Sequence, residues 1–252
     1  MQNQGKYLYC IIEASEPESF GPLGIGGRGD EVHTICYHDL SAVVSDSPII
    51  EYAVSRENTL AHERVIEEVM KNHTVLPVRF CTIAKDEAKI RIILEKEYDR
   101  FKEMMNWIDG KKELGLKAMF VENVVYGNIL KKHEEIRVFK EKIASLPPEK
   151  SLYQRMEIGR MVEIALQKEK DIHKEYILDT LSPLAVDVKI NNTYGELMVI
   201  NAAFLVEKLT EAQFDQKVQE LGNKYDGEIK FKYIGTVPPF NFVNLVIETG
   251  EY

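Results

Sequence analysis

The order of strand-like and helix-like segments after residue 110 is the feature that most restricts how this chain can fold. Residues 113–121 alternate apolar and polar side chains, as a half-buried strand does. A long helical stretch follows to about residue 181, and then come an alternating strand at 186–190 and a nearly continuous apolar run at 196–206. A short helix and a last strand at 229–233 complete the order β-α-β-β-α-β. This order predicts a ferredoxin-like fold, an antiparallel sheet with helices on one face, here with a long helical insertion.

The first half of the chain predicts a smaller and looser α+β unit. Its expected elements are strands at 6–14, 32–37, 41–45 and 74–80 and helices at 57–73 and 86–108. Asp109-Gly110 ends the second of these helices. A chain of 252 residues suits one to two domains. We therefore predict an α+β protein with a first domain at 1–110 and a second at 111–252, the latter including an apolar C-terminal tail.

Two local signals refine the first domain. Pro77 has no amide hydrogen to donate, so its strand is expected at a sheet edge or at a bulge. The segment GIGGRG, with Gly24, Gly26 and Gly29, matches G-x-G-x-x-G, but a strand rather than a helix follows it. A dinucleotide site needs that helix, because its N-terminal amides hold the pyrophosphate. A mobile surface loop is therefore the expectation.

Composition excludes several classes of protein. Asp and Glu number 41 against 32 Lys and Arg, a net charge of −9 that repels phosphate backbones, so no nucleic-acid partner is expected. The most apolar stretch, at 199–206, is far too short to span a membrane. The three cysteines lie far apart and the six histidines form no i,i+4 pair, so we predict no metal site. The polar N-terminus and the cysteine usage fit a reducing cytoplasm.

No set of residues forms a catalytic pattern. The chain has neither a G-x-S-x-G turn nor a P-loop. His62 and His73 are candidates for a general base, although a structural histidine is the simpler interpretation. We predict no catalytic residue, no cofactor and no enzymatic activity.

Arg79 and the segment Pro238-Pro239-Phe240-Asn241-Phe242 are the candidate functional residues. An Arg in an otherwise apolar strand usually pairs with a carboxylate, and Glu63 on the preceding helix is the candidate partner. Arg79 is also a candidate for binding a partner protein. Phe240 and Phe242 either cover a sheet edge or form an aromatic patch that docks another protein.

Several segments together resemble the gas vesicle protein F/L family (GvpF/GvpL), the accessory proteins of the gas-filled shells that give microbes buoyancy. The segments occur in family order and cover nearly the whole chain. They are YLYCIIEA, DLSAVVS, AHERVIEEVMKNHTVLPVRF, GKKELGLKAMF, YGELMVINAAFLV and YIGTVPPFNFV. Many relatives have Gly where this chain has Cys81, Pro-Trp where it has Thr236-Val237, and Tyr where it has Phe240.

The resemblance implies a two-domain α+β protein with a modified ferredoxin-like second domain. It also implies a non-enzymatic role in vesicle formation, in the cytoplasm and in the gas vesicle itself. The implied partners are the very hydrophobic major shell protein and other accessory proteins, and the resemblance also implies retention of some members as minor vesicle components. The alternative function is that of an enzyme or small-ligand-binding protein that uses the inter-domain cleft through Arg79, His62 and Glu63.

Overall fold

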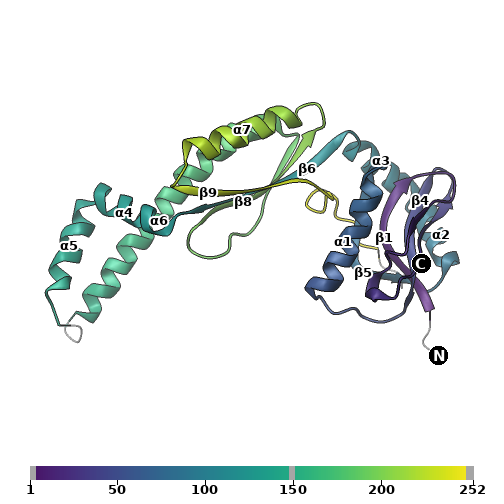
Figure 1. Ribbon diagram of the computed structural model, residues 1–252, viewed down its shortest axis with the longest axis horizontal. Helices are drawn as coiled ribbons and strands as arrows, with labels where there is room; N and C mark the ends of the chain where they lie inside the picture. Colours follow the sequence, from purple (N-terminus) through teal and green to yellow (C-terminus); the bar gives the residue numbers. More distant parts are fainter. Residues whose placement is uncertain (1–3, 148–150, 248–252) are drawn as a thin grey trace. The chain divides into compact units, whose positions relative to one another are not determined.

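The computed structural model describes residues 4–147 and 151–247, and the chain divides into two units (Figure 1). Unit 1 contains the residues up to Glu113 and the chain from Thr236 onward, and unit 2 contains Leu114–Gly235. The chain passes into unit 2 within strand β6 (Lys111–Phe120) and returns within strand β9 (Ile229–Val237). The predicted boundary at residue 110 lies close to the first passage. The apolar tail, which we placed in the second domain, clusters with unit 1 instead.

Unit 1 is a five-stranded antiparallel sheet with helices on both faces (Figure 1). The strand order is β2-β3-β4-β1-β5, so β5 lies at an edge of this sheet, as Pro77 predicts. The strands are β1 (Gln4–Glu13), β2 (Ser19–Gly21), β3 (Val32–Tyr37), β4 (Leu40–Pro48) and β5 (Val75–Ala84). The helices are η1 (Ile25–Gly27), α1 (Arg56–Met70), α2 (Glu87–Lys96) and α3 (Tyr98–Ile108).

Helix α1 forms where its sequence offers both a cap and an apolar stripe. Ser55 is the N-cap, and its side chain accepts a hydrogen bond from the Asn58 amide, which satisfies one of the free amides of the first turn. Val65, Ile66 and Val69 recur at helical spacing and are fully buried against β1. The helix therefore fixes the side chains that face the sheet, among them His62.

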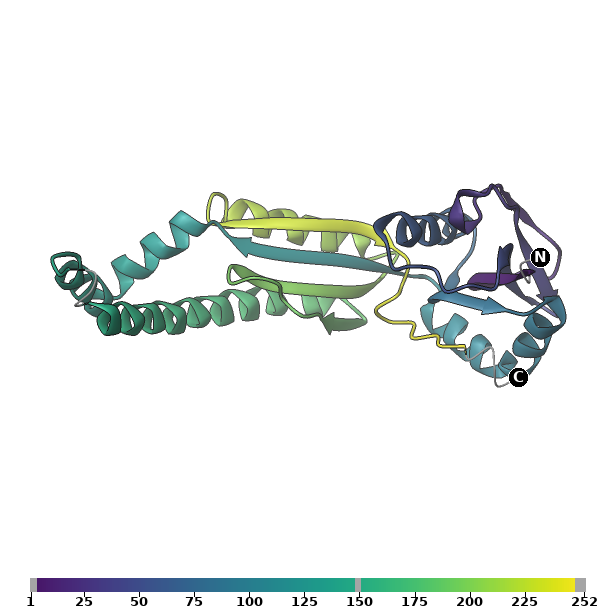
Figure 2. The same ribbon diagram turned by 90° about the horizontal axis from the view of Figure 1, so that it is seen from below.

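Unit 2 has the predicted ferredoxin-like topology. Its four strands are, in chain order, β6, β7, β8 and β9, and they lie in the sheet in the order β7-β8-β6-β9. Strand β6 is therefore between β8 and β9, and β7 is at an edge, as in a ferredoxin-like sheet. The remaining elements are α4 (Glu122–Lys132), α5 (Glu134–Ala144), α6 (Leu152–Leu181), η3 (Ser182–Leu184), β7 (Asp187–Ile190), β8 (Met198–Glu207) and α7 (Glu211–Lys224). Helices α6 and α7 pack on one face of this sheet (Figure 2).

Side chains along the strands of unit 2 point alternately to the face that the helices cover and to the opposite face of the sheet. Leu116 and Ala118 of β6 are buried in the helix-covered core, which leaves Lys117 on the opposite face. The amide of Val121 donates to the Glu228 carbonyl, and a Cβ atom on Gly115 would lie 3.7 Å from the Ile234 Cβ. Both observations give the same antiparallel register between β6 and β9. In this register Lys117 lies opposite Lys232.

The long helical stretch expected up to about residue 181 is three helices, α4, α5 and α6. Two further helices also differ from expectation. The helix expected at 86–108 is two helices, α2 and α3, because Glu97 leaves the helical conformation between them. The short helix before the last strand contains Gly222 and ends only at Lys224. Neither site carries a proline, and a glycine inside a helix weakens the helix without ending it.

Candidate protein-binding surface

Strand β5 leaves its sheet for four residues, and this bulge presents Arg79. Pro77 pairs with Cys10 of β1 and Thr82 pairs with Leu8, so one residue of β1 faces four residues of β5. Cys81 has φ +65°, a left-handed conformation that side chains disfavour. This conformation returns the strand to its register. The same bulge takes Arg79 out of the regular apolar strand that the sequence prediction assumed.

Side chains and the C-terminal tail satisfy the backbone of the bulge. The Val78 carbonyl accepts from Nε2 of His62 at 3.2 Å, and the Cys81 amide donates to the Tyr7 hydroxyl at 2.9 Å. The Arg79 amide donates to the Leu245 carbonyl, and the Arg79 carbonyl accepts from the Thr82 hydroxyl. Backbone groups removed from a ladder need such partners when they are buried. The bulge is therefore a built feature of the fold.

His62 is the inner support of the bulge and is only 2% exposed. A carbonyl can only accept, so Nε2 carries the proton and donates to Val78, while Nδ1 accepts from the Tyr7 hydroxyl at 3.1 Å. Burial lowers the pKa of His62 to about 4, against a smaller opposing effect of the Val78 carbonyl. Both ring nitrogens are in use and the ring is neutral. His62 therefore serves the fold and is not placed to act as a general base.

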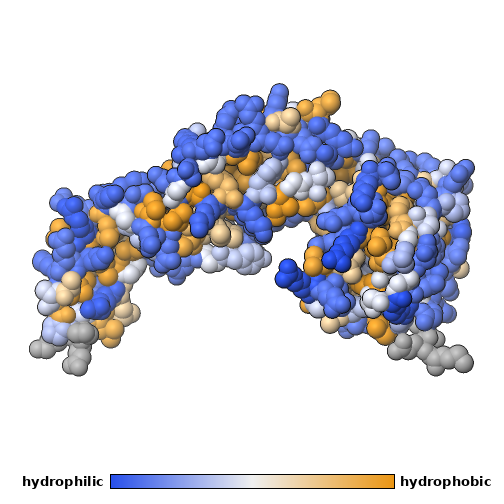
Figure 3. Space-filling view, in the orientation of Figure 1, coloured by the Kyte–Doolittle hydropathy of each residue, from blue (hydrophilic) through white to orange (hydrophobic). Residues whose placement is uncertain are grey.

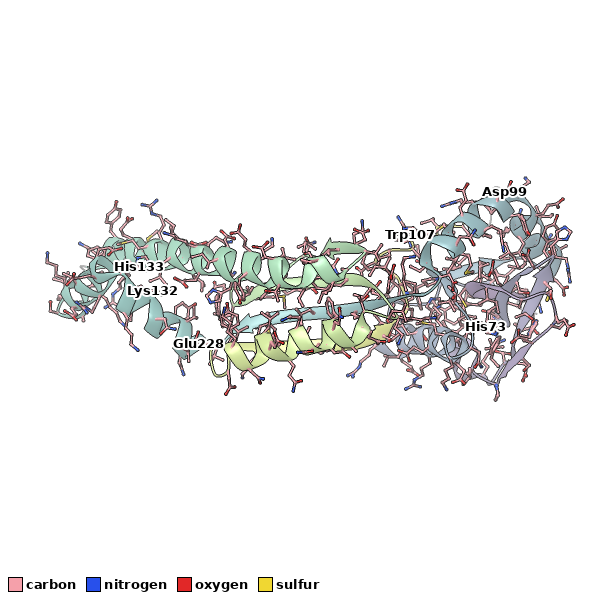
Figure 4. All side chains as sticks on the ribbon, turned by 90° about the horizontal axis from the view of Figure 1, so that it is seen from above. His73, Asp99, Trp107, Lys132, His133 and Glu228 are labelled. Carbon is pink, nitrogen blue, oxygen red and sulfur yellow. The ribbon has the colours of Figure 1, made fainter. Side chains whose placement is uncertain are left out.

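The tail, residues 238–247, covers the outer edge of β5. Val78 and Leu245 form a parallel bridge, and the buried carboxylate of Glu113 accepts hydrogen bonds from the backbone and the side-chain amide of Asn241 at 3.0 and 2.5 Å. The Phe240 ring lies 6.3 Å from the His62 ring. The Phe242 ring lies 6.5 Å from the ring of Trp107, which Figure 4 labels on α3. Of the two sequence interpretations of the tail, covering a sheet edge is the one that the structure displays.

A groove of about 770 Å³ lies beside the bulge and the tail. Arg79 and Cys81 line it, together with Ile49, Ile50 and Val54 from the segment after β4 and Val246 from the tail. All four of these apolar residues are exposed, Val54 by 86%. We call this surface the Arg79 groove. Its lining combines exposed aliphatic side chains with one cation, Arg79, and one carboxylate, Glu51, a composition that suits a largely apolar segment of another protein.

The predicted pairing of Glu63 with Arg79 is not present among the ion pairs of residues 4–147 and 151–247. Arg79 is exposed because the bulge turns it outward, so its charge does not require a partner. Glu63 is partly buried, and its pKa is raised by burial and by the nearby Glu67. Of the candidate binding residues, Arg79 is exposed, Phe240 is 38% exposed and Phe242 is half-buried.

The residues proposed for the alternative function do not converge on one site. Arg79 lines the groove, whereas His62 is buried and Glu63 is not part of the lining. Within the described residues, no group of three or more His, Cys, Asp and Glu side chains is arranged to hold a metal ion. The glycine-rich loop is anchored on the core, since Ile25 is fully buried and its amide donates to the Tyr9 hydroxyl.

Unit 2 carries a second exposed apolar surface, which the sequence analysis missed. Leu152 and Met156 of α6 are each 67% exposed, and Tyr153 is 76% exposed. Figure 3 shows apolar side chains at the surface among charged ones over the α4–α6 helices. The signal in the sequence is that apolar residues of α6 lie on more than one side of the helix, although only one side packs on the sheet.

These features define a two-unit α+β protein with a ferredoxin-like second unit and exposed apolar surfaces outside its cores. The chain belongs to the family described as gas vesicle synthesis protein GvpL/GvpF, whose model matches residues 5–244. No helix in the described part of the chain is long and apolar enough to cross a membrane.

Similar proteins agree with this assignment. Gas vesicle protein F of Dolichospermum flosaquae is 24% identical over 95% of this chain and 97% of its own length. Gas vesicle protein F of a Streptomyces species is 28% identical over 94% of this chain and 98% of its own length. The crystal structure of GvpF from Anabaena sp. PCC7120 has a TM-score of 0.81 at 24% identity and covers 96% of this chain and 99% of that one. The fold predicted from the sequence is thereby confirmed as α+β.

Proposed function

We propose that this chain is a gas vesicle accessory protein that binds the major shell protein and other accessory proteins while the vesicle forms, and that some of it stays in the vesicle as a minor component. It works in the cytoplasm and at the gas vesicle and has no catalytic role. The family match over residues 5–244 supports the vesicle role. The Arg79 groove is the observation that carries the binding role.

The physical argument concerns the exposed strands of a hydrophobic shell subunit. Unpaired strand edges and apolar surface drive aggregation before assembly. A groove with exposed aliphatic residues, one cation and one carboxylate can cover such a segment, and an acidic carrier keeps the complex dispersed. We propose Arg79 and Phe240 as residues that contact the partner. We propose that Phe242 also contacts the partner, although its ring is half-buried and offers less surface.

The test is a pull-down with this chain tagged, from cells that express the whole vesicle gene cluster, with shell protein quantified in the eluate. We expect shell protein with the wild type and much less with Arg79→Ala. Arg64→Ala is the matched control, because Arg64 is an exposed arginine on α1 outside the groove. Accessory proteins without shell protein would refute shell binding. Normal vesicle numbers after deletion of the gene would refute a required role in formation.

A further inference from the structure

The sheet of unit 2 carries three lysines on the face opposite to its helices. They are Lys117 of β6 and Lys230 and Lys232 of β9. Phe231 and Tyr233 of β9 pack against the helix-covered core, so the residues that alternate with them point away from it. In Figure 2 the strands of unit 2 lie in front of α6 and α7, and this face is toward the viewer. We call the three residues the lysine face.

The pairing of β6 with β9 brings the three positive charges together. Lys117 lies opposite Lys232, where Cβ atoms are about 5 Å apart, and Lys230 is two residues, about 7 Å, along β9. Like charges directly opposite each other on neighbouring strands destabilise a sheet. The lysine face therefore reduces the stability of unit 2, and its presence calls for a reason.

The sheet does not neutralise these charges. Neither a hydrogen bond nor an ion pair within residues 4–147 and 151–247 involves the side chain of any of the three lysines. Strand β9 has no acidic residue, and the single carboxylates of β6 and β7 are in use, Glu113 by Asn241 and Asp187 by Lys189 at 3.3 Å. The single carboxylate of β8, Glu207, is the last residue of its strand.

Protection of a sheet edge accounts for only part of the lysine face. Strand β9 is at an edge, and lysines there discourage pairing with another chain. Strand β6, however, lies between β8 and β9 and has no free edge to protect. Lys117 is therefore unexplained by edge protection, and it is the residue that creates the like-charge pair.

The surroundings of the lysines indicate which kind of anion they suit. Sheets that bind RNA stack its bases on aromatic side chains. All aromatic residues of the four strands, Phe120, Phe204, Phe231 and Tyr233, belong to the helix-covered core instead. The lysine face is bordered by aliphatic side chains, with Met119 41% exposed and Ile234 half-buried. A carboxylate-bearing polypeptide fits this surface better than a nucleic acid does.

We propose that the lysine face binds an acidic segment of another protein in an extended conformation. Side chains on one side of an extended segment repeat every 7 Å or so, which matches the spacing of Lys230 and Lys232 along their strand. Carboxylates at alternate positions would then meet these lysines, while Met119 and Ile234 contact the residues between. The proposal concerns unit 2 alone and does not depend on the Arg79 groove or on the vesicle role.

The test is fluorescence anisotropy with the purified full-length chain and a labelled peptide of alternating glutamate and threonine. The same peptide with glutamine in place of glutamate is the neutral control. We expect saturable binding of the glutamate peptide that weakens as salt is added, because exposed charges are screened. Binding no stronger than that of the glutamine peptide would overturn the proposal.

Three charge reversals locate the binding. Lys117→Glu and Lys230→Glu should each weaken binding of the glutamate peptide by about fivefold or more. Lys168→Glu is the matched control, because Lys168 is exposed on α6, on the other side of the sheet, and its reversal changes the net charge equally. It should leave binding nearly unchanged. Equal effects of all three variants would show a response to net charge alone and would overturn the proposal.

Thermal unfolding of the same variants separates loss of binding from loss of structure. Lys117→Glu removes the like-charge pair with Lys232, so this variant should melt at a higher temperature than the wild type although it binds the peptide less well. Weaker binding together with a lower melting temperature would mean that the lysine supports the fold, against the proposal. A single-stranded oligothymidylate that binds more tightly than the peptide, and less tightly to Lys117→Glu, would make the partner a nucleic acid and would also overturn it.

Discussion

The neutral state of His62 predicts how the stability of the protein depends on pH. Its pKa is lowered from an ordinary 6.5 to about 4 by burial, and its Nδ1 accepts from Tyr7. Protonation would remove the Nδ1 lone pair that accepts from Tyr7 and would place a charge on a buried ring, which burial disfavours. The native fold therefore resists protonation, while the unfolded chain takes up the proton below pH 6.5.

The sign and the size follow from proton linkage. Between pH 6.5 and about 4 the unfolded state binds one more proton than the native state, so the free energy of unfolding falls as the pH falls. Each pH unit changes the free energy of unfolding by about 1.4 kcal/mol, so the change between pH 6.5 and about 4 amounts to ~3 kcal/mol. The contribution is fully present above pH 6.5 and is lost by about pH 4.

The assay is urea denaturation at a series of pH values for the wild type and for His62→Gln, which keeps a donor for the Val78 carbonyl. The variant should be less stable at neutral pH, and its deficit should shrink by ~3 kcal/mol on going to pH 4. His33→Gln, which removes an imidazole outside the buried cluster, is the control. A deficit that is constant from pH 7 to pH 4 would refute the argument that buried neutral His62 carries this pH dependence.

Three further predictions concern single contacts. Cys81→Gly should raise the free energy of unfolding by about 0.5–1 kcal/mol, because glycine tolerates φ +65°. The variant loses the contact between Sγ and the Tyr52 amide, which reduces the gain. A lower melting temperature than that of the wild type would contradict this prediction. Asn241→Asp should loosen the tail by about 2 kcal/mol through repulsion with buried Glu113, seen as faster hydrogen exchange of the Arg79 amide. Lys117→Glu should stabilise unit 2 by about 0.5 kcal/mol by pairing with Lys232. That gain should vanish at high salt, and its persistence there would count against a charge effect.

The sequence predicted the parts of the fold that repeat a simple period. Strand β3 occupies the expected residues 32–37, and the element order of unit 2 led directly to its sheet topology. Buried strands must be apolar on their core face, so alternation and the continuous run of β8 are visible without a structure. The edge position of β5 was also predictable, from Pro77 alone.

Pro77 predicted an edge or a bulge, but the place and length of the bulge at Val78–Cys81 could not be predicted, because a proline does not specify them. Pairing with Glu63 was predicted because an arginine in an otherwise apolar strand usually needs a carboxylate, whereas the bulge leaves Arg79 exposed. A left-handed cysteine cannot be recognised from its own identity, since side chains rarely adopt φ +65°. The available signal was the glycine that many relatives have at this position, a residue for which the conformation carries little cost.

The exposed side of α6 was hidden for a different reason. Ala165 of this helix is buried, whereas Ile172, also apolar, is 52% exposed. Only one side of a 30-residue helix packs on the sheet of unit 2, and a sequence with apolar residues on several sides does not show which. Periodicity shows that a helix has an apolar side. It does not show whether a given apolar residue packs in the core of its own chain or lies exposed on the surface.

The distribution of charge connects the fold to the proposed function. Residues 114–235 contain 18 Lys and Arg against 19 Asp and Glu, which leaves 14 against 22 for unit 1, so nearly all of the net charge of −9 belongs to unit 1. Unit 1 also holds the Arg79 groove. A strongly acidic body around an apolar groove stays soluble through self-repulsion while one aliphatic surface remains open to a partner. In the proposed function, Arg79, the one basic residue among the described residues that line the groove, orients a bound segment while the acidic charge of unit 1 keeps the complex dispersed.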